Sequence, residues 1–210
     1  MSEPKAHAKR VEVVVPGLLN WHVQDDRIGG ARSDAWALTT GAETILIDPL
    51  PLETDAVGVL GNVRLVVLTI QSHQRSAWNV RKHFKIPVLA PKGSEALEEQ
   101  PDYWYEDGAE LPGGLRAIHT PGPCEASYAI LAPRPGGQVL FVGDLLVRSG
   151  KAAALGFVPA QYQDDATKTR ASVRKLLQLD APIVCPGHGA AIVGEGVEAM
   201  RRALDEDPEA

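Results

Sequence analysis

One segment near the middle of the chain, residues 65–84, constrains the fold more than any other. It opens with the apolar run Leu65–Leu68, which is typical of a strand buried on both faces. A polar turn follows, and then Ala77, Val80 and Phe84 recur at the spacing of a helix that packs one face inward. A strand, a polar turn and a helix in this order predict an α/β fold, in which ligands bind beyond the carboxyl ends of strands.

The rest of the chain alternates between strand-like and helix-like segments. We expect strands at residues 11–15, 18–24, 35–40, 44–47, 86–90, 115–119, 127–131, 139–142 and 183–185. We expect helices at 54–60, at 165–179 with Asp164 or Asp165 as N-cap, and around residues 197–204. Residues 25–33 are predicted to form a loop. No repeat and no linker is visible, so the sequence predicts one domain over residues 1–210, frayed at 1–10 and 206–210.

Composition excludes several classes of protein. A net charge of −6 and a pI near 5.5 do not favour binding to nucleic acid or to an anionic membrane. No apolar run approaches the roughly 20 residues of a membrane span, and no apolar segment follows the charged N-terminus as in a signal peptide. The two cysteines, Cys124 and Cys185, lie outside any CxxC pattern. We expect free thiols in a cytoplasmic protein, whose oligomeric state stays open.

Three polar residues directly follow predicted strands: His73, Asp144 and His188. Because such positions converge at one edge of a sheet, they are candidates for a shared pocket. Each also has a structural interpretation. His73 would cap or solvate a turn, Asp144 would have a structural partner, and His188 would bond the loop backbone.

The candidate pocket also includes Gln74 and Arg75, the neighbours of His73, and Cys185, which closes the strand before His188. A structural role in the core is the commoner one for a cysteine such as Cys185. The reactivity of both thiols therefore stays open.

Five short motifs give the chain a resemblance to the metallo-β-lactamase superfamily over residues 11–205. They are Thr44–Asp48 (TILID), Leu68–Thr69, His119–Gly122 (HTPG), Phe141–Asp144 (FVGD) and Pro186–Gly189 (PGHG). Each motif is short, but five in the family's order are specific for its fold. The resemblance implies a four-layer αββα sandwich and, in an active member, a hydrolase.

The metal-binding pattern of that family is largely absent. The family has Thr-His-x-His-x-Asp-His after the central strand, a histidine after the middle Pro-Gly, and then the Asp of Gly-Asp and the His of Pro-Gly-His. The seven ligand positions are here Ile70, Ser72, Gln74, Arg75, Pro123, Asp144 and His188. Asp144 and His188 alone keep a ligand type, as vestigial ligands, whereas a catalytic zinc needs three protein ligands. We therefore expect no conventional binuclear site and no cofactor, with zinc disfavoured.

Three classes of function remain. The favoured one is a metal-free protein on this fold that binds a small molecule or a partner without hydrolysis. The second is a divergent hydrolase that uses one metal on Asp144, His188 and His73, or a thiol near His188. The third is an interaction protein with a vestigial cleft. Arg75, at a ligand position, is expected to replace the missing cation and to pair with Asp144.

Overall fold

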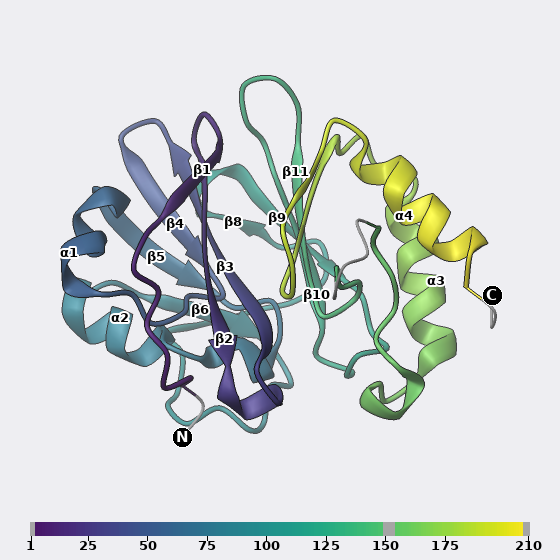
Figure 1. Cartoon of the computed structure of the whole chain (residues 1–210), viewed down its shortest axis with the longest axis horizontal. Helices are drawn as coiled ribbons and strands as arrows, with labels where there is room; N and C mark the ends of the chain where they lie inside the picture. Colours follow the sequence, from purple (N-terminus) through teal and green to yellow (C-terminus); the bar gives the residue numbers. More distant parts are fainter. Residues whose placement is uncertain (1–2, 149–153, 208–210) are drawn as a thin grey trace. The chain divides into compact units, whose positions relative to one another are not determined.

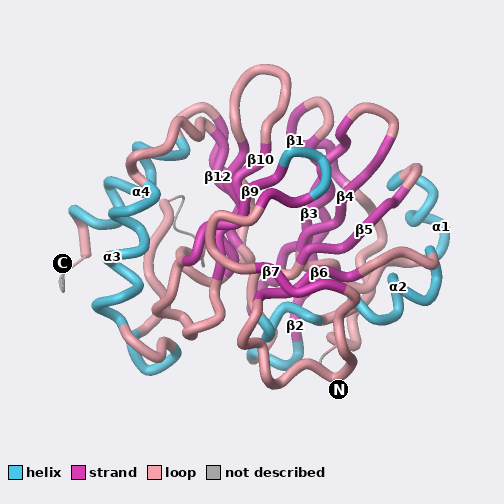
Figure 2. Tube along the Cα trace, turned by 180° about the vertical axis from the view of Figure 1, so that it is seen from behind, coloured by secondary structure: helices cyan, strands magenta, loops and turns pink. Residues whose placement is uncertain are grey.

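The structure is a computed structural model that describes residues 3–148 and 154–207. The chain divides into two compact units, Met1–Tyr105 and Glu106–Ala210. Each unit contains one β-sheet and its own helices, which Figures 1 and 2 show in two views. The prediction of a single domain with frayed ends stays a prediction, and residues 1–2 and 208–210 lie outside the described residues.

The first unit is built on a seven-stranded sheet in simple chain order. Its strands are β1 (Glu12–Val15), β2 (Leu18–Asp25), β3 (Ala31–Thr40), β4 (Glu43–Ile47), β5 (Val63–Val67), β6 (Val88–Pro91) and β7 (Tyr103–Tyr105). Neighbours from β1 to β4 are antiparallel, and those from β4 to β7 are parallel. Parallel neighbours need crossover connections, and the helices supply them.

Two of these crossovers carry the helices of the first unit. The predicted helix at 54–60 is α1 (Thr54–Val57), extended by a 3₁₀ turn at Gly58–Leu60. The predicted strand at 65–68 is β5, and the predicted helix after it is α2 (Ala77–Phe84), which contacts β5 and β6. Between β5 and α2, Gln71–Gln74 form a 3₁₀ turn. The core of the unit contains Trp21, Leu46, Val66 and Trp78 among others.

The second unit is built on a six-stranded sheet of order β13-β12-β11-β10-β9-β8. Its strands are β8 (Glu110–Leu111), β9 (Leu115–His119), β10 (Tyr128–Ala132), β11 (Val139–Gly143), β12 (Ile183–Pro186) and β13 (Ile192–Val193). Strands β11 and β12 are parallel, and the other neighbours are antiparallel. The helices α3 (Ala166–Leu176) and α4 (Gly196–Asp205) lie side by side and pack on the sheet.

The fold class that the sequence predicted, α/β with two helix-faced sheets, is confirmed. Asp165 is the N-cap of α3, because its Oδ1 accepts a hydrogen bond from the Lys168 N–H at 2.9 Å. Three short strands were not predicted, β7, β8 and β13, because two or three residues carry no readable periodicity. Several boundaries also differ from the prediction. The largest shifts are at β3, which already begins at Ala31 inside the predicted loop, and at α3, which ends three residues before residue 179. Within the described ranges no helix has the length and apolar character needed to cross a membrane.

The β2–β3 hairpin carries a buried carboxylate, Asp25, that gives the fold a pH dependence. Its oxygens accept hydrogen bonds from Arg27 Nε at 2.9 Å and from Ser33 Oγ at 2.8 Å. Burial raises the pKa of Asp25, but the bonds from Arg27 and Ser33 outweigh burial and lower the pKa from 3.8 to about 2.

We expect the Asp25 carboxylate to stabilise the fold above about pH 4, and this contribution to be lost as the pH falls through about 2. The contribution is about 1–2 kcal/mol once the partial exposure of Arg27 is allowed for. Urea unfolding between pH 2 and 6 measures it. Asp25→Asn should flatten the dependence over this window, whereas Asp55→Asn, in the first turn of α1, should leave it steep. Equal slopes in the Asp25→Asn variant and the wild type would contradict the assignment.

Candidate functional site

The turn after β5 places a histidine against a buried carboxylate. Asp48 directly follows β4, and the parallel pairing of β4 with β5 brings the ends of the two strands together. The Asp48 carboxylate accepts hydrogen bonds from the Thr69 N–H at 2.7 Å, from Thr69 Oγ1 at 2.5 Å and from His73 Nδ1 at 2.8 Å. All three residues are buried. The site in this unit is therefore a preformed carboxylate–histidine pair.

The pair fixes the chemistry of the imidazole. An ionised carboxylate only accepts hydrogen bonds, so Nδ1 of His73 carries the proton that points at Asp48. In a neutral ring the lone pair then resides on Nε2. A carboxylate hydrogen-bonded to Nδ1 also holds the imidazole ring in one orientation. The geometry therefore prepares Nε2 of His73 to accept a proton.

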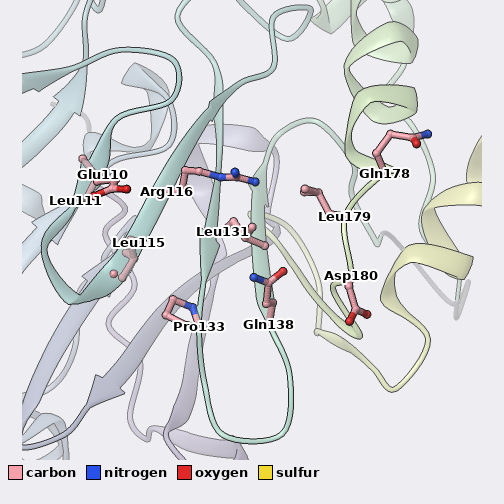
Figure 3. A pocket seen from close by; sticks show the side chains of 11 residues that line it. Glu110, Leu111, Leu115, Arg116, Leu131, Pro133, Gln138, Gln178, Leu179 and Asp180 are labelled. Carbon is pink, nitrogen blue, oxygen red and sulfur yellow. The ribbon is translucent and has the colours of Figure 1, made fainter.

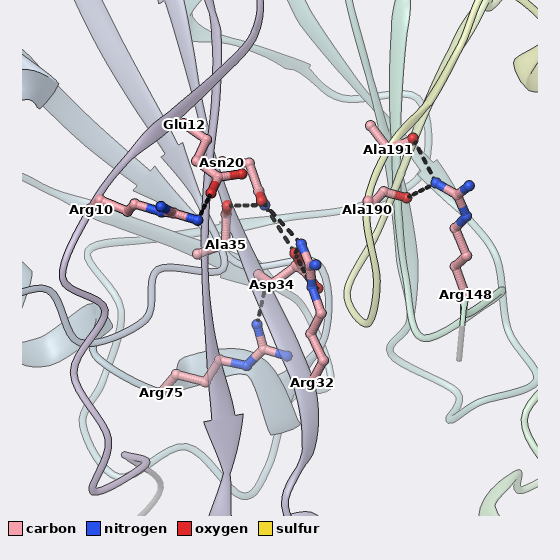
Figure 4. A network of polar contacts seen from close by, with 10 residues as sticks. All are labelled: Arg10, Glu12, Asn20, Arg32, Asp34, Ala35, Arg75, Arg148, Ala190 and Ala191. Carbon is pink, nitrogen blue, oxygen red and sulfur yellow. Dashed lines mark hydrogen bonds and ion pairs between the residues drawn. The ribbon is translucent and has the colours of Figure 1, made fainter. Parts of the chain in front are cut away.

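Arg75, two residues further on, is held in a strained backbone conformation. Its φ is 36° and its ψ is −114°, and its side chain is buried. Nη1 donates to the carbonyl oxygen of Asp34 at 2.7 Å (Figure 4). It also donates to the carbonyl oxygen of Asp48 at 3.4 Å. Asp48 also has a positive φ, of 49°. Strained non-glycine residues of this kind gather at functional sites, and here two of them are joined by a hydrogen bond.

The carboxylate of Asp34 is neutralised by a different arginine. It is fully buried and accepts hydrogen bonds from Arg32 Nη2 at 2.6 Å and from Asn20 Nδ2 at 3.1 Å (Figure 4). The guanidinium of Arg75 therefore meets the backbone of Asp34, while Arg32 meets its side chain.

Gln74 belongs to the scaffold of the first unit. Its Oε1 accepts hydrogen bonds from Trp78 Nε1 at 2.8 Å and from the Glu98 N–H at 2.7 Å. Its Nε2 donates to the carbonyl oxygen of Ala96 at 3.1 Å. Three of the four bonds that a carboxamide can make are thus used to tie α2 to the 96–98 loop.

The second unit brings Asp144 and His188 together. Asp144 directly follows β11, and His188 lies two residues beyond its parallel neighbour β12. His188 Nε2 lies 3.2 Å from Asp144 Oδ1, and each side chain is about one-fifth exposed. The Arg148 N–H donates to the His188 carbonyl oxygen at 2.7 Å, and Arg148 Nη1 donates to the Ala191 carbonyl oxygen at 3.2 Å (Figure 4).

Gly189 is the residue that permits this loop. Its φ is +108°, and a Cβ there would lie 2.2 Å from the carbonyl oxygen of Arg148. An L-residue at this position would therefore displace the backbone that holds His188.

Both cysteines are free thiols, as predicted. Cys185 is buried on β12. Burial raises the pKa of the Cys124 thiol to about 11, so this thiol stays protonated and unreactive at neutral pH.

The predicted site residues come from both units. His73, Gln74 and Arg75 lie on one turn of the first unit, and Asp144, His188 and Cys185 lie at two adjacent strand ends of the second. The predicted shared pocket and the predicted pairing of Arg75 with Asp144 stay predictions. Sequence reasoning missed Asp48, although its position directly after an apolar strand was the same signal that selected Asp144.

The turn does not fit the metal ligand set that its motifs imply. Of the four ligand positions in this turn, Ile70 is apolar and buried, and Arg75 is a cation that cannot ligate. The Gln74 carboxamide is committed to the 96–98 loop, and Ser72 replaces a histidine. At these four positions three histidines and an aspartate of the family pattern are replaced, so this turn does not offer the ligand set of the usual metal pair.

Comparison with known proteins gives one family and one fold. A family model described as the metallo-beta-lactamase superfamily matches residues 12–206. Among solved structures, the metallo-beta-lactamase DIM-1 is 16% identical, with a TM-score of 0.74 over 95% of this chain and 98% of its own. A metallo-beta-lactamase from Pontibacter korlensis is 16% identical, with a TM-score of 0.73 over 94% of this chain and 99% of its own.

The metallo-beta-lactamase FIM-1 from Pseudomonas aeruginosa, in its mono-zinc form, is 16% identical. Its TM-score is 0.71 over 98% of both chains. At these identities the likeness establishes the fold. A search of curated proteins finds no significant match.

Proposed function

The chain belongs to the metallo-beta-lactamase superfamily, and from this premise we propose that it binds a small molecule but lacks the pair of metal ions needed to hydrolyse it. The proposal rests on the side-chain contacts of the turn after β5. Gln74 and Arg75, at two of the family's ligand positions, are buried and hydrogen-bonded to the first unit's own backbone. We infer that this turn stabilises the scaffold of a cytoplasmic binding protein.

The names of the solved neighbours do not extend the proposal to β-lactam hydrolysis. FIM-1 was solved with one zinc ion, and a catalytic zinc needs three protein ligands. Of the seven family positions this chain keeps Asp144 and His188 as ligand types, and a third ligand is missing from the pattern.

One observation favours a second candidate, a hydrolase that needs no metal. The Asp48–His73 hydrogen bond, at 2.8 Å, is the arrangement in which a carboxylate orients a histidine as general base. In such an enzyme His73 Nε2 would remove the proton of an attacking water. Asp48 would hold the ring and stabilise the imidazolium that forms.

We expect full-length protein, purified without added metal, to contain well under about 0.3 zinc, iron or manganese ions per chain, because fewer than three pattern ligands remain. Elemental analysis of the wild type and of Asp144→Ala measures this content. One ion or more per chain, lost in Asp144→Ala, would overturn the proposal.

The same preparation separates the two candidates. Chelator-treated protein should not turn over p-nitrophenyl acetate above the rate of free imidazole. Turnover that is lost in His73→Asn but kept in His22→Asn, a matched change on β2, would replace the binding function by the metal-free hydrolase.

A further inference from the structure

The second unit contains a pocket whose lining includes none of the candidate site residues described above (Figure 3). Its volume is about 640 Å³, within the range of small-molecule sites, roughly 300–1,000 Å³. Its apolar lining includes Leu111, Leu131, Pro133 and Leu179. Polar side chains surround this lining: Glu110, Arg116, Gln138, Gln178 and Asp180.

The fold leaves this part of the sheet open because α3 ends too early to cover it. Arg116 and Ile118 point to the same face of β9, since side chains alternate along a strand. Ile118 packs in the core with Leu176, the last residue of α3. Arg116 lies two residues before Ile118 on β9, opposite Leu131 of β10 and Glu110 of β8. Figure 3 shows its side chain reaching across the sheet towards Leu179.

The charged groups of the pocket are not neutralised by one another. In the part of the chain that the structure describes, Arg116 forms no hydrogen bond or ion pair with its side chain, although Glu110 is its cross-strand neighbour. The carboxylates of Glu110 and Asp180 also have no side-chain partner there. The Arg116 guanidinium, which has five N–H donors, and the carboxylates of Glu110 and Asp180 thus line one pocket that also has an apolar lining.

We propose that this pocket binds a small zwitterion with an apolar body, an amino acid with an apolar side chain. The Arg116 guanidinium would hold the ligand carboxylate through two parallel hydrogen bonds. Glu110 and Asp180 would hold its ammonium. The ligand side chain would cover Leu131 and Leu179. This site is independent of the turn and the strand ends on which the proposed function rests.

Titration of ¹⁵N-labelled full-length protein with L-phenylalanine tests the proposal. We expect saturable shifts of the side-chain amide signals of Gln138 and Gln178. Phenylalaninamide lacks the carboxylate and N-acetyl-phenylalanine lacks the ammonium. Each should bind about 10-fold more weakly or worse, the equivalent of one charge-assisted hydrogen bond. Equal affinity for all three compounds, or no saturation with L-phenylalanine, would overturn the assignment.

Two variants assign the charges. Arg116→Met should weaken L-phenylalanine binding about 10- to 100-fold. Arg201→Met, the same change of charge on α4, should leave it unchanged. Glu110→Gln should reduce the preference for L-phenylalanine over its N-acetyl form while the protein still binds the carboxylate. If the Arg116→Met variant binds L-phenylalanine as tightly as the Arg201→Met variant does, the pocket does not recognise a carboxylate and the proposal fails. Because metal content plays no part in these measurements, their failure leaves the proposed function standing.

Discussion

Replacing Asp48 by alanine is expected to lower the free energy of unfolding by about 3–5 kcal/mol. The change removes the acceptor of three buried donors, the Thr69 N–H, Thr69 Oγ1 and His73 Nδ1. Each stranded donor costs about 1–3 kcal/mol, and the costs do not add fully because the donors share one partner. An alanine at a φ of 49° adds backbone strain. Urea unfolding monitored by tryptophan fluorescence measures the loss.

Two further variants separate the carboxylate from its charge and its backbone. Asp48→Asn keeps a side-chain oxygen for Thr69 and tolerates a positive φ, so it should cost clearly less than alanine. Asp55→Ala removes the same charge from the exposed first turn of α1 and should have a much smaller effect. A small loss in Asp48→Ala, equal to that of Asp55→Ala, would show that the Asp48 hydrogen bonds do not hold the turn.

The sequence predicts the longer elements of this fold because their patterns extend over enough residues. The apolar run before residue 69 and the helical stripe from Ala77 to Phe84 correspond to β5 and α2. Strand β7, Tyr103–Tyr105, has three residues, too few for a periodic pattern. Its pairing with β6 is set by the chain between them, which has no regular pattern of its own.

The candidate site is predictable only as far as strand ends identify it. His73 was selected because it follows β5, but its partner Asp48 lies 25 residues earlier and reaches it through the parallel register of β4 and β5. The contacts of Gln74 with residues 96 and 98 depend on the path of a loop. No periodicity encodes such a path, so a resemblance identifies the position of Gln74 without revealing what it binds.

The backbone conformation of Arg75 could not be predicted from the sequence either. A non-glycine residue at a φ of 36° has no signal in the sequence, where glycine is the usual marker of such a conformation. The structure explains this conformation, because the buried guanidinium of Arg75 donates to the carbonyl oxygens of Asp34 and Asp48. The side chain therefore holds the backbone in a state that its own residue type disfavours.

Replacing Arg75 by alanine is accordingly expected to destabilise the protein by about 3–5 kcal/mol. The change empties a large buried site and leaves the Asp34 and Asp48 carbonyl oxygens without this donor. Arg75→Met refills most of the volume but donates nothing, so it should recover the packing part and keep a loss of about 1–3 kcal/mol. Thermal and urea unfolding of the two variants separate packing from hydrogen bonding.

Arg75→Gly tests the backbone strain directly. At an ordinary helical or extended position glycine is about 0.5–1 kcal/mol less stable than alanine, because it loses more conformational freedom on folding. At a φ of 36° and a ψ of −114° a Cβ is disfavoured, so the order should reverse and the glycine variant should be at least as stable as the alanine variant. If glycine is the less stable of the two, Arg75 is not strained. The guanidinium would then act through its hydrogen bonds alone, without holding the turn in a disfavoured conformation.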